Sequence, residues 1–243
     1  GPLTDSSHWR RWLPESADAG DLSLPVIAPL PPLTMAAGDP IRQRFTDQAL
    51  VQKWATGPAS LPWNRLALEL IVKYQQNPLR AARVLAHLHA AAHDAIVGLA
   101  ATSSEEAAQA VAVHAAAAGV LAHFYPRESP GRLEAIGIGA MLAVAASAQM
   151  SPQTLDFARA AGRRAAAEAI RRALGDGGDA NWNPADRPSP AAHVWRAAPP
   201  LNLSNPSEPL AGKWRTWALA DGREIQPPPP PLFGSERYWE EAR

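Results

Sequence analysis

Apolar side chains recur at helical spacing through the middle of the chain. Within 62–76, Leu66, Leu70 and Tyr74 follow one another four residues apart. Residues three or four positions apart share one face of a helix, so this spacing predicts an amphipathic helix. Nowhere does the sequence alternate apolar and polar residues for long enough to predict a strand.

Start and stop signals divide this region into separate helices. Asn77, Ser129 and Ser151 each precede a proline, an order typical of a helix N-terminus. Ser103 and Glu106 have the spacing of a capping box, in which each side chain bonds the other residue's backbone N–H. We therefore predict helices over 46–54, 62–76, 78–99, 104–124, 130–149 and 152–174, and the start of another in 233–243.

The predicted fold class is all-α. We expect a bundle of five to six alanine-rich helices over 46–175, preceded by an extended proline-rich arm over 1–45 and followed by a long linker rich in proline and tryptophan over 176–243. Small side chains let helix axes approach closely. Gly137 and Gly139, each costing about 1 kcal/mol against alanine inside a helix, are expected where helices pack most tightly.

Charge and composition narrow the classes of function. The net charge is zero, which argues against nucleic-acid binding, and there is no cysteine, which excludes disulfides and thiolate metal sites. The longest uncharged run, 135–155, is rich in alanine and glycine and falls short of a membrane span. We expect a soluble helical protein.

Two histidines form the only metal candidate in the sequence. His89 and His93 lie four residues apart on one predicted helix, a spacing that can ligate zinc. The glutamate of the zinc-protease motif is missing, and Asp94 lies on another face of the helix. A buried histidine or Asp94 bonded to a neighbouring backbone group or to Arg83 is therefore the favoured interpretation, and a metal site the alternative.

The C-terminal segment carries large aromatic side chains. Such side chains need a surface against which to bury. We expect the segment to cover the bundle or another part of a larger protein, with an interface formed by Trp182, Trp195, Lys213, Trp214, Arg215 and Trp217. No catalytic residue is predicted, because the sequence contains no nucleophile elbow, phosphate-binding glycine loop or plausible catalytic triad.

Four runs of the sequence carry a resemblance to a known family. They are NPLRAARVLAHLHAAAHDA (77–95), VHAAAAGVLAHFYP (113–126), GKWRTW (212–217) and PPPLFGS (229–235). Together they resemble the N-terminal helical half of bacterial vanadium-dependent haloperoxidase-like proteins, which belong to the type 2 phosphatidic acid phosphatase superfamily. The resemblance covers roughly 46–243.

The resemblance implies that the catalytic centre lies elsewhere. The family's motifs are a lysine six residues before Arg-Pro, a Pro-Ser-Gly-His block, and a Ser-Arg block followed by a histidine and an aspartate. Here Lys73 precedes Arg80 at a similar distance, but Ala81 replaces the proline, and no Ser-Gly-His occurs. No catalytic, cofactor-binding or metal residue is therefore carried over, and vanadate would be held by the rest of the parent protein.

Three hypotheses follow. In the first, the chain is the structural bundle of a haloperoxidase-like oxidoreductase or an acid phosphatase-like hydrolase and is inactive alone. Its partner is a downstream catalytic helical half of the same protein, and a homodimer is a further expectation. The second is an autonomous helical module that binds a ligand or a protein without catalysis. The third is a metal protein that uses His89 and His93. The sequence does not determine the cellular compartment, and export to the periplasm is one expectation.

Overall fold

The computed structural model describes residues 10–13, 54, 56–100, 103, 105–187, 189, 195–200, 202–220, 222–225 and 227–243. The chain divides into two units, Gly1–Ala173 and Leu174–Arg243. The first unit is a helical bundle, and the second consists largely of turns. Throughout the described residues there is no strand, so the predicted all-α class is confirmed.

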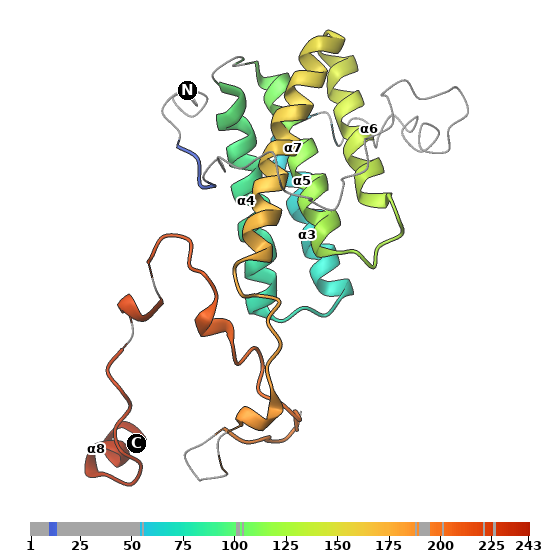
Figure 1. Ribbon diagram of the computed structural model, residues 1–243. Helices are drawn as coiled ribbons and strands as arrows, with labels where there is room; N and C mark the ends of the chain where they lie inside the picture. The colour runs from blue at the N-terminus through green and yellow to red at the C-terminus, as the bar shows by residue number, and fades with distance from the viewer. Residues whose placement is uncertain are drawn as a thin grey trace. The chain divides into compact units, whose positions relative to one another are not determined.

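The bundle is formed by long helices joined by short connections (Figure 1). They are α3 (Ser60–Lys73), α4 (Pro78–Ala100), α5 (Glu106–Phe124), α6 (Arg132–Ser147) and α7 (Pro152–Leu174). Each of the five corresponds to a helix predicted from the sequence, with ends that differ by at most a few residues. The remaining predicted bundle helix, 46–54, lies outside the described residues except for Trp54, which is helical.

Two of the predicted helix caps are formed. The Asn77 side-chain oxygen accepts a hydrogen bond from the backbone N–H of Arg80 at 3.0 Å, and Ser151 Oγ accepts from the N–H of Thr154 at 3.1 Å. Each bond satisfies an N–H that has no partner within its own helix. These two bonds explain why α4 and α7 begin at the prolines that follow.

Two other predicted caps are wrong. The chain turns after Ser129, and α6 begins at Arg132 behind Gly131, whose φ of 72° is left-handed. Glu105 rather than Ser103 precedes α5, and no side chain caps that helix. Ser103 Oγ instead accepts from the N–H of Glu105 at 3.3 Å, a local bond that competes with the predicted capping box.

The central helix, α5, packs against α3, α4 and α6. An ideal Cβ on Gly162 of α7 would lie 2.1 Å from the carbonyl oxygen of Ala112, and one on Gly137 of α6 would lie 2.6 Å from the Cβ of Ala118. Neither position has room for a methyl group. The close packing predicted around Gly137 is therefore present, and α7 also approaches α5 closely at Gly162.

Among the described helices, α5 alone is long and apolar enough to cross a membrane. Within the bundle, 61% of that stretch is buried. The span candidate is therefore α5 rather than the run 135–155, and burial inside the protein accounts for its apolar composition.

In the second unit, Asp176 bonds both a neighbouring residue and one far along the sequence. The carbonyl oxygen of Asp176 accepts from the N–H of Arg215 at 2.8 Å, and its carboxylate accepts from the N–H of Gly178 at 2.7 Å. Short 3-10 turns follow, and the unit ends in helix α8 (Glu236–Glu241), which Ser235 caps through the N–H of Tyr238. The helix expected in 233–243 is thus present.

Candidate functional site

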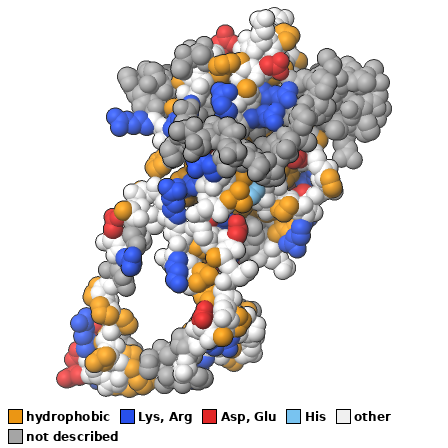
Figure 2. All heavy atoms as spheres, in the orientation of Figure 1, with side chains coloured by type: hydrophobic (Ala, Val, Ile, Leu, Met, Phe, Trp, Pro, Cys, Tyr) orange, Lys and Arg blue, Asp and Glu red, His pale blue; other side chains and the backbone are white. Residues whose placement is uncertain are grey.

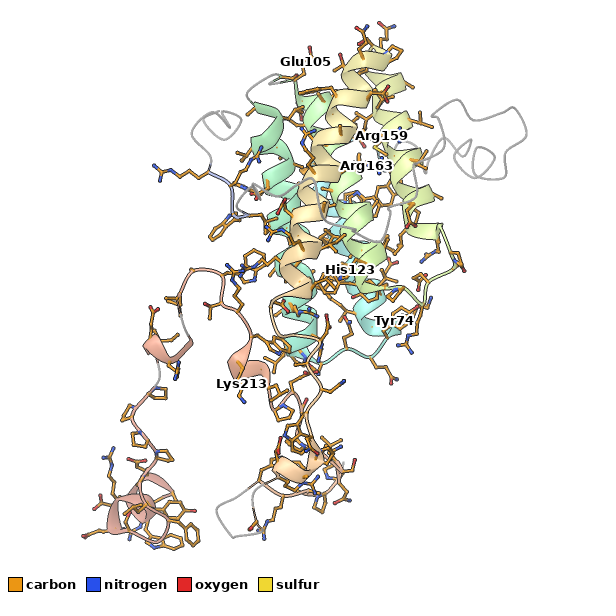
Figure 3. All side chains as sticks on the ribbon, in the orientation of Figure 1. Tyr74, Glu105, His123, Arg159, Arg163 and Lys213 are labelled. Atoms are coloured by element: carbon orange, nitrogen blue, oxygen red, sulfur yellow. The ribbon has the colours of Figure 1, made fainter. Side chains whose placement is uncertain are left out.

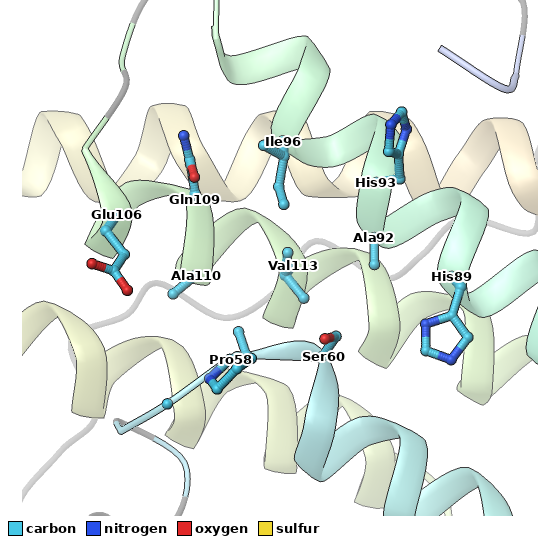
Figure 4. Close-up of a pocket in the computed structure, with 12 residues that line it drawn as sticks. Pro58, Ser60, His89, Ala92, His93, Ile96, Glu106, Gln109, Ala110 and Val113 are labelled. Carbon is cyan, nitrogen blue, oxygen red and sulfur yellow. The ribbon is translucent and has the colours of Figure 1, made fainter. Parts of the chain in front are cut away.

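A cavity of about 350 Å³ lies where the starts of α3 and α5 meet the middle of α4 (Figure 4). Its length runs between two polar ends. Glu106 and Gln109 from the first turn of α5 form one end, and His89 and Ser60 lie toward the other. The cavity therefore combines polar groups from three helices.

Apolar side chains occupy the stretch between those ends. Ala92 of α4 and Val113 of α5 are buried beneath it, while Ile96 and Ala110 are partly exposed along it. Pro58 closes the side next to α3 (Figure 4). An apolar middle with a few polar groups at defined points is the usual construction of a small-molecule site.

His89 offers its Nδ1 atom to the cavity as a hydrogen-bond acceptor. Its Nε2 lies 3.0 Å from the side-chain oxygen of Asn64, which can only accept, so Nε2 carries the proton and Nδ1 is left as an acceptor. Partial burial lowers the pKa of His89 from its ordinary value of 6.5. The ring is therefore neutral at neutral pH.

His93 lines the same cavity but is bonded to Asp94. Its Nδ1 lies 3.0 Å from the Asp94 carboxylate, and its ring turns away from Ser60 and Val113 (Figure 4). Among the described residues, no group of three histidine, cysteine, aspartate or glutamate side chains could hold a metal ion. The structure thus brings His89 and His93 to one cavity without assembling a third ligand around them.

Asp94 bonds the described part of the N-terminal segment to α4. Its two carboxylate oxygens accept the backbone N–H groups of Trp12 and Leu13 at 2.8 and 2.7 Å. Leu13 is only 2% exposed. The sequence analysis favoured a bonded Asp94, but these partners were not predicted, because the sequence gives no signal that pairs two residues about eighty positions apart.

A second polar cluster joins the end of α3 to the turn between α5 and α6. The Glu128 carboxylate accepts from Lys73, from Arg132 and, at 2.8 Å, from the Tyr74 hydroxyl. These donors lower the pKa of Glu128 to about 2, with the Lys73 hydrogen bond as the largest cause. Tyr74 also stacks on Tyr125 with ring centroids 5.5 Å apart.

This cluster is structural in character. It has one carboxylate between two cations, and the Tyr125 hydroxyl donates to Gln76 at 2.8 Å. No carboxylate in it is left to act as a base. It fixes the turn that lies where Ser129 was expected to cap a helix beginning at residue 130.

A buried histidine lies in the centre of the bundle. His114 is fully buried on α5, and its Nδ1 accepts from the indole N–H of Trp63 at 2.8 Å. Trp54 packs edge-on against the Trp63 ring, with centroids 5.0 Å apart. Burial lowers the pKa of His114 to about 4. The Trp63–His114 pair fills the core rather than a site.

Basic side chains follow one face of α7. Figure 2 shows lysine and arginine side chains gathered on the face of the bundle where α7 runs, and Figure 3 labels Arg159 and Arg163 there. Partial burial lowers the pKa of Arg159, and the nearby charge of Arg163 lowers it further. Arg171 forms an ion pair with Glu168 three residues earlier.

The predicted interface residues all lie in the second unit. Lys213 and Arg215 are exposed, Trp182, Trp214 and Trp217 are half-buried, and Trp195 is 44% exposed. The guanidinium of Arg187 lies 5.7 Å from the Trp195 ring. Their role as an interface stays a prediction.

Sequence reasoning identified two of the cavity's polar residues, His89 and His93. It assigned Glu106 to a helix cap and did not single out Ser60 or Gln109, because nothing in the sequence indicates that the starts of α3 and α5 lie together. Comparison of the chain with family models, with curated proteins and with solved structures finds no match.

Proposed function

We propose that this chain is the structural helical bundle of a protein similar to the vanadium-dependent haloperoxidases or to the type 2 phosphatidic acid phosphatases. The parent protein would oxidise halide with peroxide and vanadate, or hydrolyse a phosphate ester. The bundle itself would contribute no catalytic residue. Its role would be to support a downstream catalytic helical half and to shape the entrance to that half.

The observation that carries the proposal is an apolar stripe on the outer face of α3. Leu61, Leu68 and Val72 are 45%, 46% and 75% exposed. Their spacing places them on one side of the helix, while the opposite side buries Trp63 and Leu70 in the bundle. A helix that is apolar on both faces is suited to packing between two layers of helices.

Exposed aromatic residues of the second unit give independent support. Trp195, Phe233 and Trp239 are 44%, 48% and 52% exposed, although each carries a large apolar surface. Side chains of this kind are enriched at buried interfaces. In the proposed arrangement they join Trp182, Lys213, Trp214, Arg215 and Trp217 in contact with the catalytic half.

The natural coding sequence tests the proposal directly. We expect it to continue past Arg243 into the family's Pro-Ser-Gly-His and Ser-Arg blocks. A stop codon directly after Arg243 would contradict the proposal.

Activity measurements on the isolated chain give a second test. With added vanadate, peroxide and bromide, or with a phosphomonoester, we expect no turnover above buffer. Turnover that survives repurification would show that the chain carries its own catalytic site and would overturn the proposal.

The alternative function is an autonomous binding module without catalysis. The cavity beside His89 favours it, because its volume is within the usual range for small-molecule sites. The coding sequence beyond Arg243 separates the two functions, because a stop codon there would favour the autonomous module.

A further inference from the structure

Three of the polar side chains at the cavity ends have no side-chain partner among the described residues, whereas His89 is bonded to Asn64. The Glu106 carboxylate and the Gln109 amide make no side-chain hydrogen bond or ion pair with a described residue, and neither does the Ser60 hydroxyl. In Figure 4 they come from two helices that begin on opposite sides of the hollow. Three polar side chains are thus available to a molecule that enters it.

The charge of the lining favours a cation. Among the described residues around the cavity, Glu106 is the one carboxylate, and there is no lysine or arginine. His89 is neutral because burial lowers its pKa. His93 is bonded to the carboxylate of Asp94. A cationic group therefore meets one carboxylate, in the first turn of α5, and no positively charged lysine or arginine among the described lining residues, whereas an anion would be repelled by that carboxylate.

The dimensions of the cavity limit the ligand. At about 30 Å³ for each water-sized group, 350 Å³ holds roughly a dozen heavy atoms. Ile96, Val113 and Ala110 form the apolar middle, which suits an aromatic or aliphatic body. At the far end, His89 Nδ1 and Ser60 can bond a terminal hydroxyl.

We propose that this cavity binds a small primary amine with an apolar body, whose ammonium group pairs with Glu106. The body lies between Ile96 and Val113, and Gln109 accepts a further hydrogen bond from the ammonium group. This proposal depends on the geometry of the cavity and not on the scaffold function proposed above.

Calorimetric titration of the full chain with 2-phenylethylamine tests the proposal. We expect saturable binding with one molecule per chain. Phenylacetate, which has the same ring and the opposite charge, should not bind, and 2-phenylethanol should bind more weakly than the amine. Absence of saturable amine binding, or equal binding of phenylacetate, would overturn the proposal.

Two matched variants locate the site. Glu106→Gln should weaken amine binding roughly tenfold or more, because it removes the charge-assisted hydrogen bond. Glu105→Gln changes the neighbouring exposed carboxylate, which does not line the cavity, and should leave the affinity unchanged. Equal affinity of the Glu106→Gln variant and the unchanged chain would also overturn the proposal.

A third variant fills the cavity without changing its charge. Ala110→Phe places a ring in the apolar middle and should abolish binding. Thermal melting of each variant shows whether it is folded, and the two glutamate variants keep the test decisive if Ala110→Phe does not fold. Failure of amine binding leaves the scaffold proposal to be decided by its own test, the coding sequence beyond Arg243.

Discussion

The carboxylate of Asp94 accepts the backbone N–H of Leu13 at 2.7 Å, although 81 residues separate them in the sequence. Its other oxygen accepts the N–H of Trp12 at 2.8 Å and lies 3.0 Å from Nδ1 of His93. The carboxylate is nearly buried in the middle of α4. One aspartate thus fixes the described part of the N-terminal segment to the bundle.

Removing this carboxylate should release the segment. In Asp94→Ala, two backbone N–H groups lose a charged acceptor, and we expect the free energy of unfolding to fall by about 1.5–3 kcal/mol. Trypsin cleavage after Arg10 and Arg11 should accelerate. Urea unfolding and timed proteolysis measure the two effects.

Asp156→Asn provides the control for this prediction. The Asp156 side chain is 71% exposed, and its nearest cation, on Arg159, is 3.9 Å away. In the Asp156→Asn variant, the free energy of unfolding should change by no more than about 0.5 kcal/mol. If Asp94→Ala behaves like this control in both measurements, the anchoring role of Asp94 is wrong.

Local chemistry explains which parts of the fold could be predicted. Helical periodicity and the Asn77 and Ser151 caps depend on neighbouring residues, so the sequence was sufficient to place α4 and α7. The Ser129 cap failed because Glu128 is drawn to Lys73 and Arg132, which fixes the turn differently. That attraction depends on where α3 ends in space, which periodicity does not specify.

Only some of the residues that line the cavity could be predicted, because the others depend on how the helices pack. His89 and His93 share a helix face, so their proximity followed from spacing alone. Glu106 and Ser60 reach the cavity because two helix starts lie beside α4, and that arrangement results from tertiary packing. Trp63 and His114 likewise meet across two helices, and their pairing had no signal in the sequence.

Glu128 should make the protein sensitive to acid below about pH 4.5. Its pKa is about 2 in the folded chain, below the ordinary value of 4.5. The unfolded chain therefore binds more protons between these values, so stability is present above pH 4.5 and is lost as the pH falls toward 2. Denaturant midpoints measured across this window should decrease with falling pH.

Glu128→Gln should flatten that dependence, because the amide does not titrate. The variant should be less stable at pH 7, where the native carboxylate bonds Lys73, Tyr74 and Arg132. An unchanged slope between pH 4.5 and 2 would show that other groups dominate the acid response.

His114 should make the stability depend on pH at higher values than Glu128 does. Its pKa is about 4 in the folded chain against 6.5 ordinarily, because burial disfavours the charged ring. Protonation therefore favours the unfolded chain, and stability should fall by up to about 3 kcal/mol as the pH decreases from 6.5 to 4. In His114→Gln, an acceptor for the Trp63 indole remains without the titration, so the slope in this window should be smaller. A His114 ring whose NMR shifts titrate near pH 6.5 would contradict the prediction.

Gly162 tests a close contact between α5 and α7. A methyl group at this position would lie 2.1 Å from the Ala112 carbonyl oxygen and 2.8 Å from the Ala115 Cβ, so α5 and α7 must separate to admit it. Gly162→Ala should therefore cost about 1–3 kcal/mol or more by urea unfolding, even though alanine has the higher helix propensity. Gly212→Ala, in the 3-10 turn Ala211–Lys213 of the second unit, is the control for adding a methyl group to a glycine, because a Cβ there meets nothing within 4 Å. If Gly162→Ala, like this control, is as stable as the unchanged chain, the close approach of α7 to α5 is not present in solution.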